Sequence, residues 1–204
     1  MVSLHFVFWF MVIFFTLIGY LRGWQREVIA LSGLVASIAA LSQFGDSITG
    51  LIGGLTGTIQ PDPLDPLAFQ RQQFWVQAVF HSLIAFFSYQ VVARLANQAT
   101  GGRLGERIRS GLERRVVGAM IGAINGYLAI GGIWGFLEYQ ITSAGYVQLP
   151  PGQSYPFDPS VIIRPDAAAA ASALASYLPM GLFSPNVWLI LFFISFFIVI
   201  IALI

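Results

Sequence analysis

Few side chains in this sequence could do chemistry, and His81 is the clearest of them. It lies within a long apolar segment, where an imidazole could ligate a metal, a haem or the magnesium of a chlorophyll-type pigment. It could equally bond a backbone carbonyl, Gln90 or Asn125. No second histidine stands at helical spacing from it. We therefore expect hydrogen bonding rather than ligation, and neither a metal nor another cofactor is expected.

Signatures of enzymes are absent from the sequence. It has no His-Glu-x-x-His, no phosphate loop, no Gly-x-Gly-x-x-Gly and no Gly-x-Ser-x-Gly. Cysteine is absent too, which excludes thiol catalysis and disulfides. Asp62 and Asp65 fall in a Pro-rich stretch, without a rigid element to orient them. We therefore expect no enzymatic activity.

The composition indicates a membrane protein. Of the 204 residues, 57% are hydrophobic and only 9% are charged, and the mean hydropathy is +0.77. Soluble domains carry about 25% charged residues, so lipid must cover much of this surface. The predicted fold is all-α: a polytopic helical membrane protein with about five transmembrane helices and one short interfacial helix.

The apolar runs place these elements along the chain. We expect spans over residues 4–21, 28–44, 74–95 and 116–139, and a short helix over 167–178, all within one membrane domain of residues 1–180. Residues 181–204 would add a C-terminal, largely lipid-facing span, with Ser184-Pro185 as its start signal. Residues 45–73 are expected to form a connector, extended where it is rich in proline.

Two stretches of small residues predict close helix packing. Gly118, Gly122 and Gly126 recur every four residues and form one narrow face of a helix. Ser32, Ala36 and Ala40 repeat the pattern in the second span. Such faces let helix backbones approach closely in a bilayer. The glycine face is expected to pack within the chain, against this second face, or to form a subunit interface, and Asn125 beside it is expected to hydrogen-bond another helix.

The arginines predict the topology. With five alternating spans, one side holds eight arginines and three acids, and the other holds two arginines and six acids. The positive side faces the cytoplasm, so the N-terminus is expected outside and the C-terminus inside. Glu27 is expected to pair with Arg22 or Arg26. Contact with lipid headgroups or a partner is predicted for Arg22, Arg26, Glu27, Arg103, Arg107, Arg114 and Arg115. Topology explains these arginines, so nucleic-acid binding is not expected.

Two motifs resemble the colicin V production protein family of small bacterial inner-membrane proteins. They are Arg22-Gly23-x-x-Arg26-Glu27 and Arg115-Val116-Val117-Gly118-x-x-x-Gly122-Ala123-x-x-Gly126, with a weaker third at Tyr177-Leu178-Pro179. The resemblance covers roughly residues 1–180. The chain departs from the family pattern at His5 and Arg114, where the family has aspartate, at Asn125, where it often has arginine, and in its extra span.

The resemblance implies a non-enzymatic, multi-pass protein of the bacterial inner membrane. Such a protein would act in toxin production or export, or in envelope-related processes, through helix packing and partner contacts. Its expected partners are the lipid bilayer, with bound lipid, and other membrane proteins or copies of itself. One alternative is an accessory subunit of a respiratory or photosynthetic complex, with His81 near a pigment or haem. A second alternative is a small channel or transporter, which the scarcity of charged residues within the spans disfavours.

Overall fold

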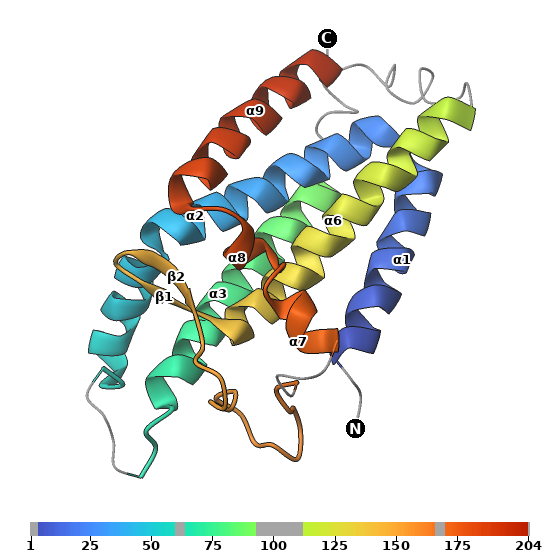
Figure 1. Cartoon of the computed structure of the whole chain (residues 1–204). Coiled ribbons are helices and arrows are strands. Elements are labelled where there is room, and N and C mark those ends of the chain that lie inside the picture. Colours follow the sequence, from blue (N-terminus) through green and yellow to red (C-terminus); the bar gives the residue numbers. More distant parts are fainter. Residues whose placement is uncertain (1–3, 60–63, 93–111, 166–169, 204) are drawn as a thin grey trace.

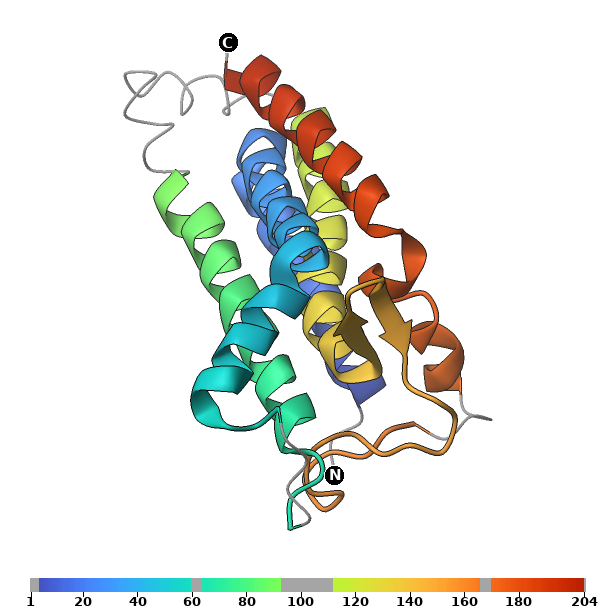
Figure 2. The same cartoon turned by 90° about the vertical axis from the view of Figure 1, so that its left-hand side faces the viewer.

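In the described part of the chain, five long helices form a bundle, and the smaller elements lie near one end of it (Figures 1 and 2). The structure is a computed structural model and describes residues 4–59, 64–92, 112–165 and 170–203. The helices are α1 (Leu4–Arg22), α2 (Trp24–Thr56), α3 (Ala68–Phe87) with its π-helical continuation η1 (Ser88–Val92), α6 (Leu112–Glu138), α7 (Ala170–Ala175), α8 (Pro179–Leu182) and α9 (Pro185–Leu203). A hairpin of β1 (Tyr139–Thr142) and β2 (Gly145–Gln148) follows α6 directly.

Helix α2 is the central element, since it contacts α3, α6 and α9, while α1 packs mainly on α6. The ends of α1, α3 and α9 and the starts of α2 and α6 lie at one end of the bundle (Figures 1 and 2). We call this the arginine end, because Arg22, Arg26, Arg114 and Arg115 belong to these helix termini. The opposite end carries the hairpin and is called the hairpin end.

The expectation that a connector begins at residue 45 is wrong, because α2 continues as a helix to Thr56. Its 33 residues correspond to about 50 Å, well beyond a hydrocarbon core of about 30 Å. Gly45 and Gly53 lie within the helix and are buried, since side chains from other elements pack onto them. The helix ends at Gly57, whose φ of 75° is a left-handed conformation that suits glycine.

Among the described residues, three helices are long and apolar enough to cross a membrane, namely α1, α2 and α6. The count of about five spans is therefore not established. In α9, residues Pro185–Ile201 form a shorter apolar helix, and α3 is not among the three. The helix at the predicted third span, residues 74–95, is α3, which starts at Ala68; residues 93–95 lie outside the described part. Similarly, α6 starts at Leu112 rather than at residue 116.

Helix α3 has its polar face inside and its apolar face outside. The buried face carries Gln73, Gln77, His81 and, in η1, Ser88, whereas the outer face exposes Trp75, Val79, Leu83, Phe86 and Phe87. This is the reverse of a surface helix in water, where polar residues face the solvent. The pattern matches an environment of lipid outside and a polar interior.

The hairpin makes the all-α expectation incomplete. Tyr139 pairs with Gln148 and Thr142 with Gly145 in antiparallel register. The amide of Gln73 on α3 satisfies Ile141 in the manner of a neighbouring strand: its nitrogen donates to the Ile141 carbonyl at 2.9 Å, and its oxygen accepts from the Ile141 N–H at 3.3 Å. The short strand edge is thus covered by a side chain.

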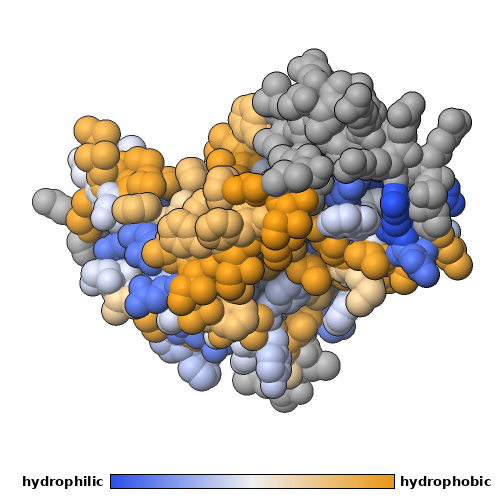
Figure 3. Space-filling model, turned by 90° about the horizontal axis from the view of Figure 1, so that it is seen from above, coloured by the Kyte–Doolittle hydropathy of each residue, from blue (hydrophilic) through white to orange (hydrophobic). Residues whose placement is uncertain are grey.

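The C-terminal elements follow the proline signals in the sequence. Helices α8 and α9 begin at Pro179 and Pro185, the first helical position that proline favours. The predicted short helix is described as α7 from Ala170, and residues 167–169 lie outside the described part. Helix α9 packs on α2, burying Trp188 and Ser195, and exposes most of its Phe and Ile side chains. Seen from the arginine end, hydrophobic residues gather over the middle of the molecule, with hydrophilic patches on either side (Figure 3).

Candidate functional site

The glycine face of α6 packs against α1. Cβ atoms built at Gly122 and Gly126 would lie 3.0 Å from the Cα atoms of Gly19 and Val12, which is tighter than most real Cβ contacts. Gly118 meets Gly19 and Gly23 in the same way. The backbones are therefore in direct contact, as small-residue faces permit. The expectation that this face meets the second span is wrong.

The small-residue face of α2 has a different neighbour. Ala36 and Ala40 line a cavity of about 310 Å³, and its other walls include Phe80 of α3 and Phe192 of α9. Ser32 bonds the carbonyl of Ile29 in its own helix at 2.8 Å. The small-residue face of α2 is thus directed toward α3 and α9, and α9 covers it.

A buried polar cluster joins four elements below the arginine end. The carboxyl group of Glu27 (α2) is fully buried and lies 3.2 Å from Nη1 of Arg22 (α1). Asn125 (α6) donates to Glu27 Oε2 at 2.8 Å and to the Glu27 carbonyl at 3.0 Å. Tyr89 (η1) donates to Oε2 at 3.0 Å. We call these four residues the helix-junction cluster.

Arg22 connects the cluster to the rest of the arginine end. Its Nη2 donates to the Tyr89 carbonyl at 3.0 Å, and its guanidinium lies 4.6 Å from the centre of the Tyr89 ring. Of the two predicted partners of Glu27, the structure selects Arg22. The bond from Asn125 runs to another helix, as the sequence led us to expect. Tyr89 was not anticipated, because its place on η1 beside Glu27 depends on tertiary packing.

His81 is enclosed by α2 and α6. Its Nδ1 lies 2.9 Å from Oγ of Ser37, and its Nε2 would be 2.9 Å from a Cβ built at Gly132. The ring therefore rests directly on the α6 backbone. Its hydrogen-bonding partner is Ser37 rather than Gln90 or Asn125.

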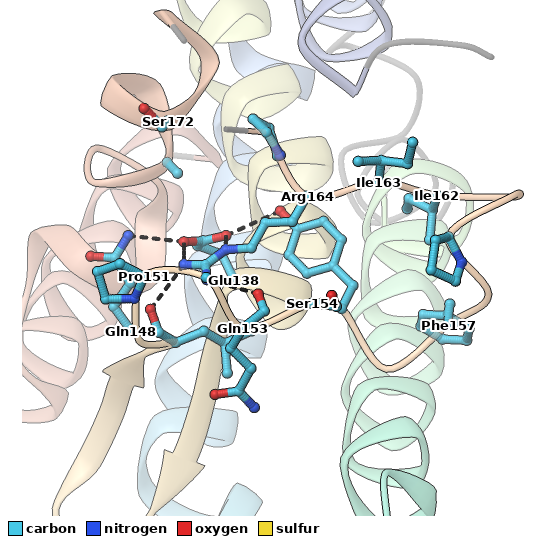
Figure 4. Close-up of a pocket in the computed structure, with 16 residues that line it drawn as sticks. Glu138, Gln148, Pro151, Gln153, Ser154, Phe157, Ile162, Ile163, Arg164 and Ser172 are labelled. Atoms are coloured by element: carbon cyan, nitrogen blue, oxygen red, sulfur yellow. Dashed lines mark hydrogen bonds and ion pairs between the residues drawn. The ribbon is translucent and has the colours of Figure 1, made fainter. Parts of the chain in front are cut away.

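A second buried polar network, which the sequence did not reveal, lies at the hairpin end (Figure 4). Glu138 at the end of α6 is 2% exposed and accepts two bonds from Arg164, at 2.6 and 3.1 Å. Gln148 and Tyr155 donate to the same carboxyl group at 3.0 and 3.1 Å. Trp134 donates to Tyr155 at 3.0 Å. We call these residues the loop-anchoring network.

Arg164 uses all five of its N–H donors within this network. Besides Glu138, it donates to the carbonyls of Leu149, Pro150 and Gln153 at 2.8, 2.6 and 3.0 Å. Hydrogen bonding and charge attraction from Glu138 raise the pKa of Arg164. Burial, followed by the nearby negative charge of Glu138, raises the pKa of Tyr155. The guanidinium lines a cavity of about 500 Å³ (Figure 4) but keeps no donor for a ligand.

The remaining predicted contact residues lie at the arginine end or outside the described part. Arg26 is half-buried, and Arg114 and Arg115 are exposed on the first turn of α6. Arg103 and Arg107 lie outside the described residues. Within the part of the chain that the structure describes, no three His, Cys, Asp or Glu residues are grouped to hold a metal ion.

Long apolar helices with polar groups turned inward define a helical integral membrane protein. The chain belongs to the colicin V production protein family, whose model matches residues 4–148. No curated protein and no solved structure gives a match. The matched segment runs from α1 through β2 and contains the entire helix-junction cluster. Arg164 and helices α7 to α9 lie beyond it.

Proposed function

We propose that this protein serves colicin V production as a non-catalytic component of the bacterial inner membrane, acting in toxin export or a related envelope process. It works through a rigid helical core that presents surfaces to the bilayer and to other membrane proteins or copies of itself. It needs no resident cofactor and keeps lipid bound. Its N-terminus lies outside and its C-terminus in the cytoplasm, because the arginine end faces inward.

One observation carries this proposal: the two buried carboxyl groups among the described residues of the matched segment are engaged within the chain. Glu27 is held by Arg22, Asn125 and Tyr89, and Glu138 by Arg164, Gln148 and Tyr155. Groups engaged in this way fix helix positions and are not poised for proton transfer to a substrate. Family membership supplies the process, and this packing supplies the mode of action.

The test is colicin V secretion from a bacterial strain that lacks its own family member and expresses this chain. The wild-type chain should restore secretion. Gly122→Leu should not, because a side chain there collides with the α1 backbone, with Phe15 O 2.5 Å from the Cβ. Gly50→Leu is the matched control, since nothing lies within 4 Å of a Cβ at Gly50. Secretion by the Gly122→Leu protein at the wild-type level would refute a packing-based mode of action.

A second candidate, transport through the bundle, is favoured by the polar buried face of α3. Gln73, Gln77 and His81 follow one another at four-residue spacing and face the interior. Intramembrane polar residues that face a bundle interior are typical of ion pathways. Proteoliposomes containing the wild-type chain and His81→Phe should then differ in proton flux. Equal flux in both, at the level of empty liposomes, eliminates this candidate.

A further inference from the structure

The arginines at the two ends of the bundle are in different states of pairing. At the hairpin end, Arg71 forms an ion pair with Asp65 and Arg164 with Glu138. At the arginine end, Arg22 pairs with Glu27, but Arg26, Arg114 and Arg115 have no ion-pair partner among the described residues. Glu113 is the one further acid on the described helix termini there. Three arginines without an ion-pair partner thus stand against a single further acid, Glu113, on the described helix termini at this end.

The packing of α6 on α1 brings these cations together. Gly118 lies against Gly23, with 3.0 Å from a built Cβ to the Gly23 Cα. Arg26 follows Gly23 by three residues, and Arg114 and Arg115 precede Gly118 by four and three. Arg115 also lies 5.8 Å from the centre of the Tyr20 ring on α1. The backbone contact therefore concentrates positive charge where three helices terminate.

Arg26 shows most directly that an acceptor is missing. Its Nε is buried and has no hydrogen-bond partner among the described residues. A buried guanidinium donor without an acceptor is costly, because it has lost water and gained nothing in return. Arginine presents paired donors that match phosphate oxygens. Trp24 and Tyr20, the aromatic types that anchor helices at headgroup depth, precede it in the sequence by two and six residues.

We propose that Arg26, Arg114 and Arg115 form a binding site for the phosphate of an anionic lipid headgroup. A phosphate placed there supplies acceptors for Arg26 and balances the excess charge of the α6 start. The hairpin end is not such a site, because its described arginines are already paired. This inference rests only on the chain's place in a bilayer, not on a role in toxin production.

The experiment uses the purified full chain in neutral detergent. Phosphatidylglycerol, phosphatidylcholine or inorganic phosphate is added at equal phosphate concentration, and lipid retention by native mass spectrometry and the melting temperature are recorded. Phosphatidylglycerol should be retained and should raise the melting temperature, and the other two should not. Each of Arg26→Gln, Arg114→Gln and Arg115→Gln should weaken retention about fivefold, given about 1 kcal/mol per arginine near an anionic surface.

Arg71→Gln is the matched control, since it removes one arginine that is already paired at the other end. Arg71→Gln should leave the retention of phosphatidylglycerol unchanged. Arg115→Lys should keep most of the retention, because lysine preserves the positive charge at residue 115. Equal retention of phosphatidylcholine, or loss in Arg71→Gln as large as in Arg26→Gln, would overturn the proposal. Equal stabilisation by inorganic phosphate would assign the site to a free anion and overturn its assignment to lipid. A colicin V secretion defect alone would not bear on this site.

Discussion

The helix-junction cluster and the loop-anchoring network are both buried Arg–Glu pairs, yet they are built differently. Arg22 and Glu27 are five residues apart, and their partners Tyr89 and Asn125 come from two further elements. Glu138 instead meets an arginine 26 residues later, whose other bonds go to loop carbonyls. The first pair therefore fixes helices to one another, and the second fixes a loop onto the bundle. Only the first lies wholly within the segment that the family model matches.

The largest expected effect follows from removing the carboxyl group that joins the helices. Glu27→Ala should lower the free energy of unfolding by about 4 kcal/mol, because it leaves Arg22 without its ion-pair partner and removes the carboxylate acceptor of Asn125 and Tyr89. Glu27→Gln keeps an oxygen for Asn125 and Tyr89 and should lose less. Unfolding of the full chain in mixed detergent measures both. Glu113→Ala, which removes an exposed acid at the same end, should stay within about 0.5 kcal/mol of the wild type.

Replacement of Arg164 tests the other half of the comparison. Arg164→Gln should cost about 3 kcal/mol, somewhat less than Glu27→Ala, because the Arg164 side chain is 15% exposed. The loss should be local: amides of residues 149–165 should exchange faster with solvent while those of α1 and α2 keep their protection. Arg71→Gln, at a pair more than a third exposed on both sides, should change stability by less than about 1 kcal/mol. Faster exchange throughout the helices would show that both pairs hold the bundle.

Backbone contact between α1 and α6 supports the helix-junction cluster and gives the next smaller effect. Gly122→Ala should destabilise the protein by about 2 kcal/mol, since the added carbon meets Phe15 O at 2.5 Å. Gly50→Ala, with open space around it, should instead be neutral or stabilising by up to about 1 kcal/mol, through helix propensity. Thermal unfolding of the two variants compares them directly. Opposite signs are the expected result, and a stabilised Gly122→Ala protein would contradict the contact.

Local signals were enough to predict much of the arginine end. The first span and the glycine face follow from periodicity rules that need no tertiary information, and so does, from capping rules, the proline start of α9 toward the opposite end. The pairing of Glu27 with Arg22 could also be predicted from the sequence, because the two residues flank one turn. The partner of the glycine face could not be predicted, since α1 has a single glycine, Gly19, at the contact and no small-residue repeat.

The hairpin end was harder to predict because its contacts are distant in sequence. Four glycines between residues 45 and 54 suggested a connector, yet tertiary packing keeps that stretch helical. The hairpin had a weak signal in the alternating Tyr139–Thr142 and in Gly145, whose φ is 111°. From the sequence, Glu138 counted only as one of the six acids on the outer side, because no nearby residue indicates that Arg164 packs over it.

The smallest predicted effect concerns Tyr155 and the pH dependence of the loop-anchoring network. Burial and Glu138 raise the pKa of Tyr155 above its ordinary value of about 10, so the unfolded chain loses this proton first. Stability is therefore fully present below pH 10 and falls as the pH rises above it, by up to about 1.4 kcal/mol per pH unit for one such group.

Tyr155→Phe should lower stability at pH 8 by about 1 kcal/mol, through the lost bonds to Glu138 and Trp134, and should make the decline between pH 10 and 11 shallower. Burial also raises the pKa values of Tyr139 and Tyr146, so part of the decline remains. Tyr177→Phe, at an exposed side chain, is the control and should keep the wild-type slope. If Tyr155→Phe declines in stability between pH 10 and 11 as steeply as the wild type, the fold does not hold the phenol of Tyr155 in its protonated form. Glu138 would then be bound chiefly by Arg164.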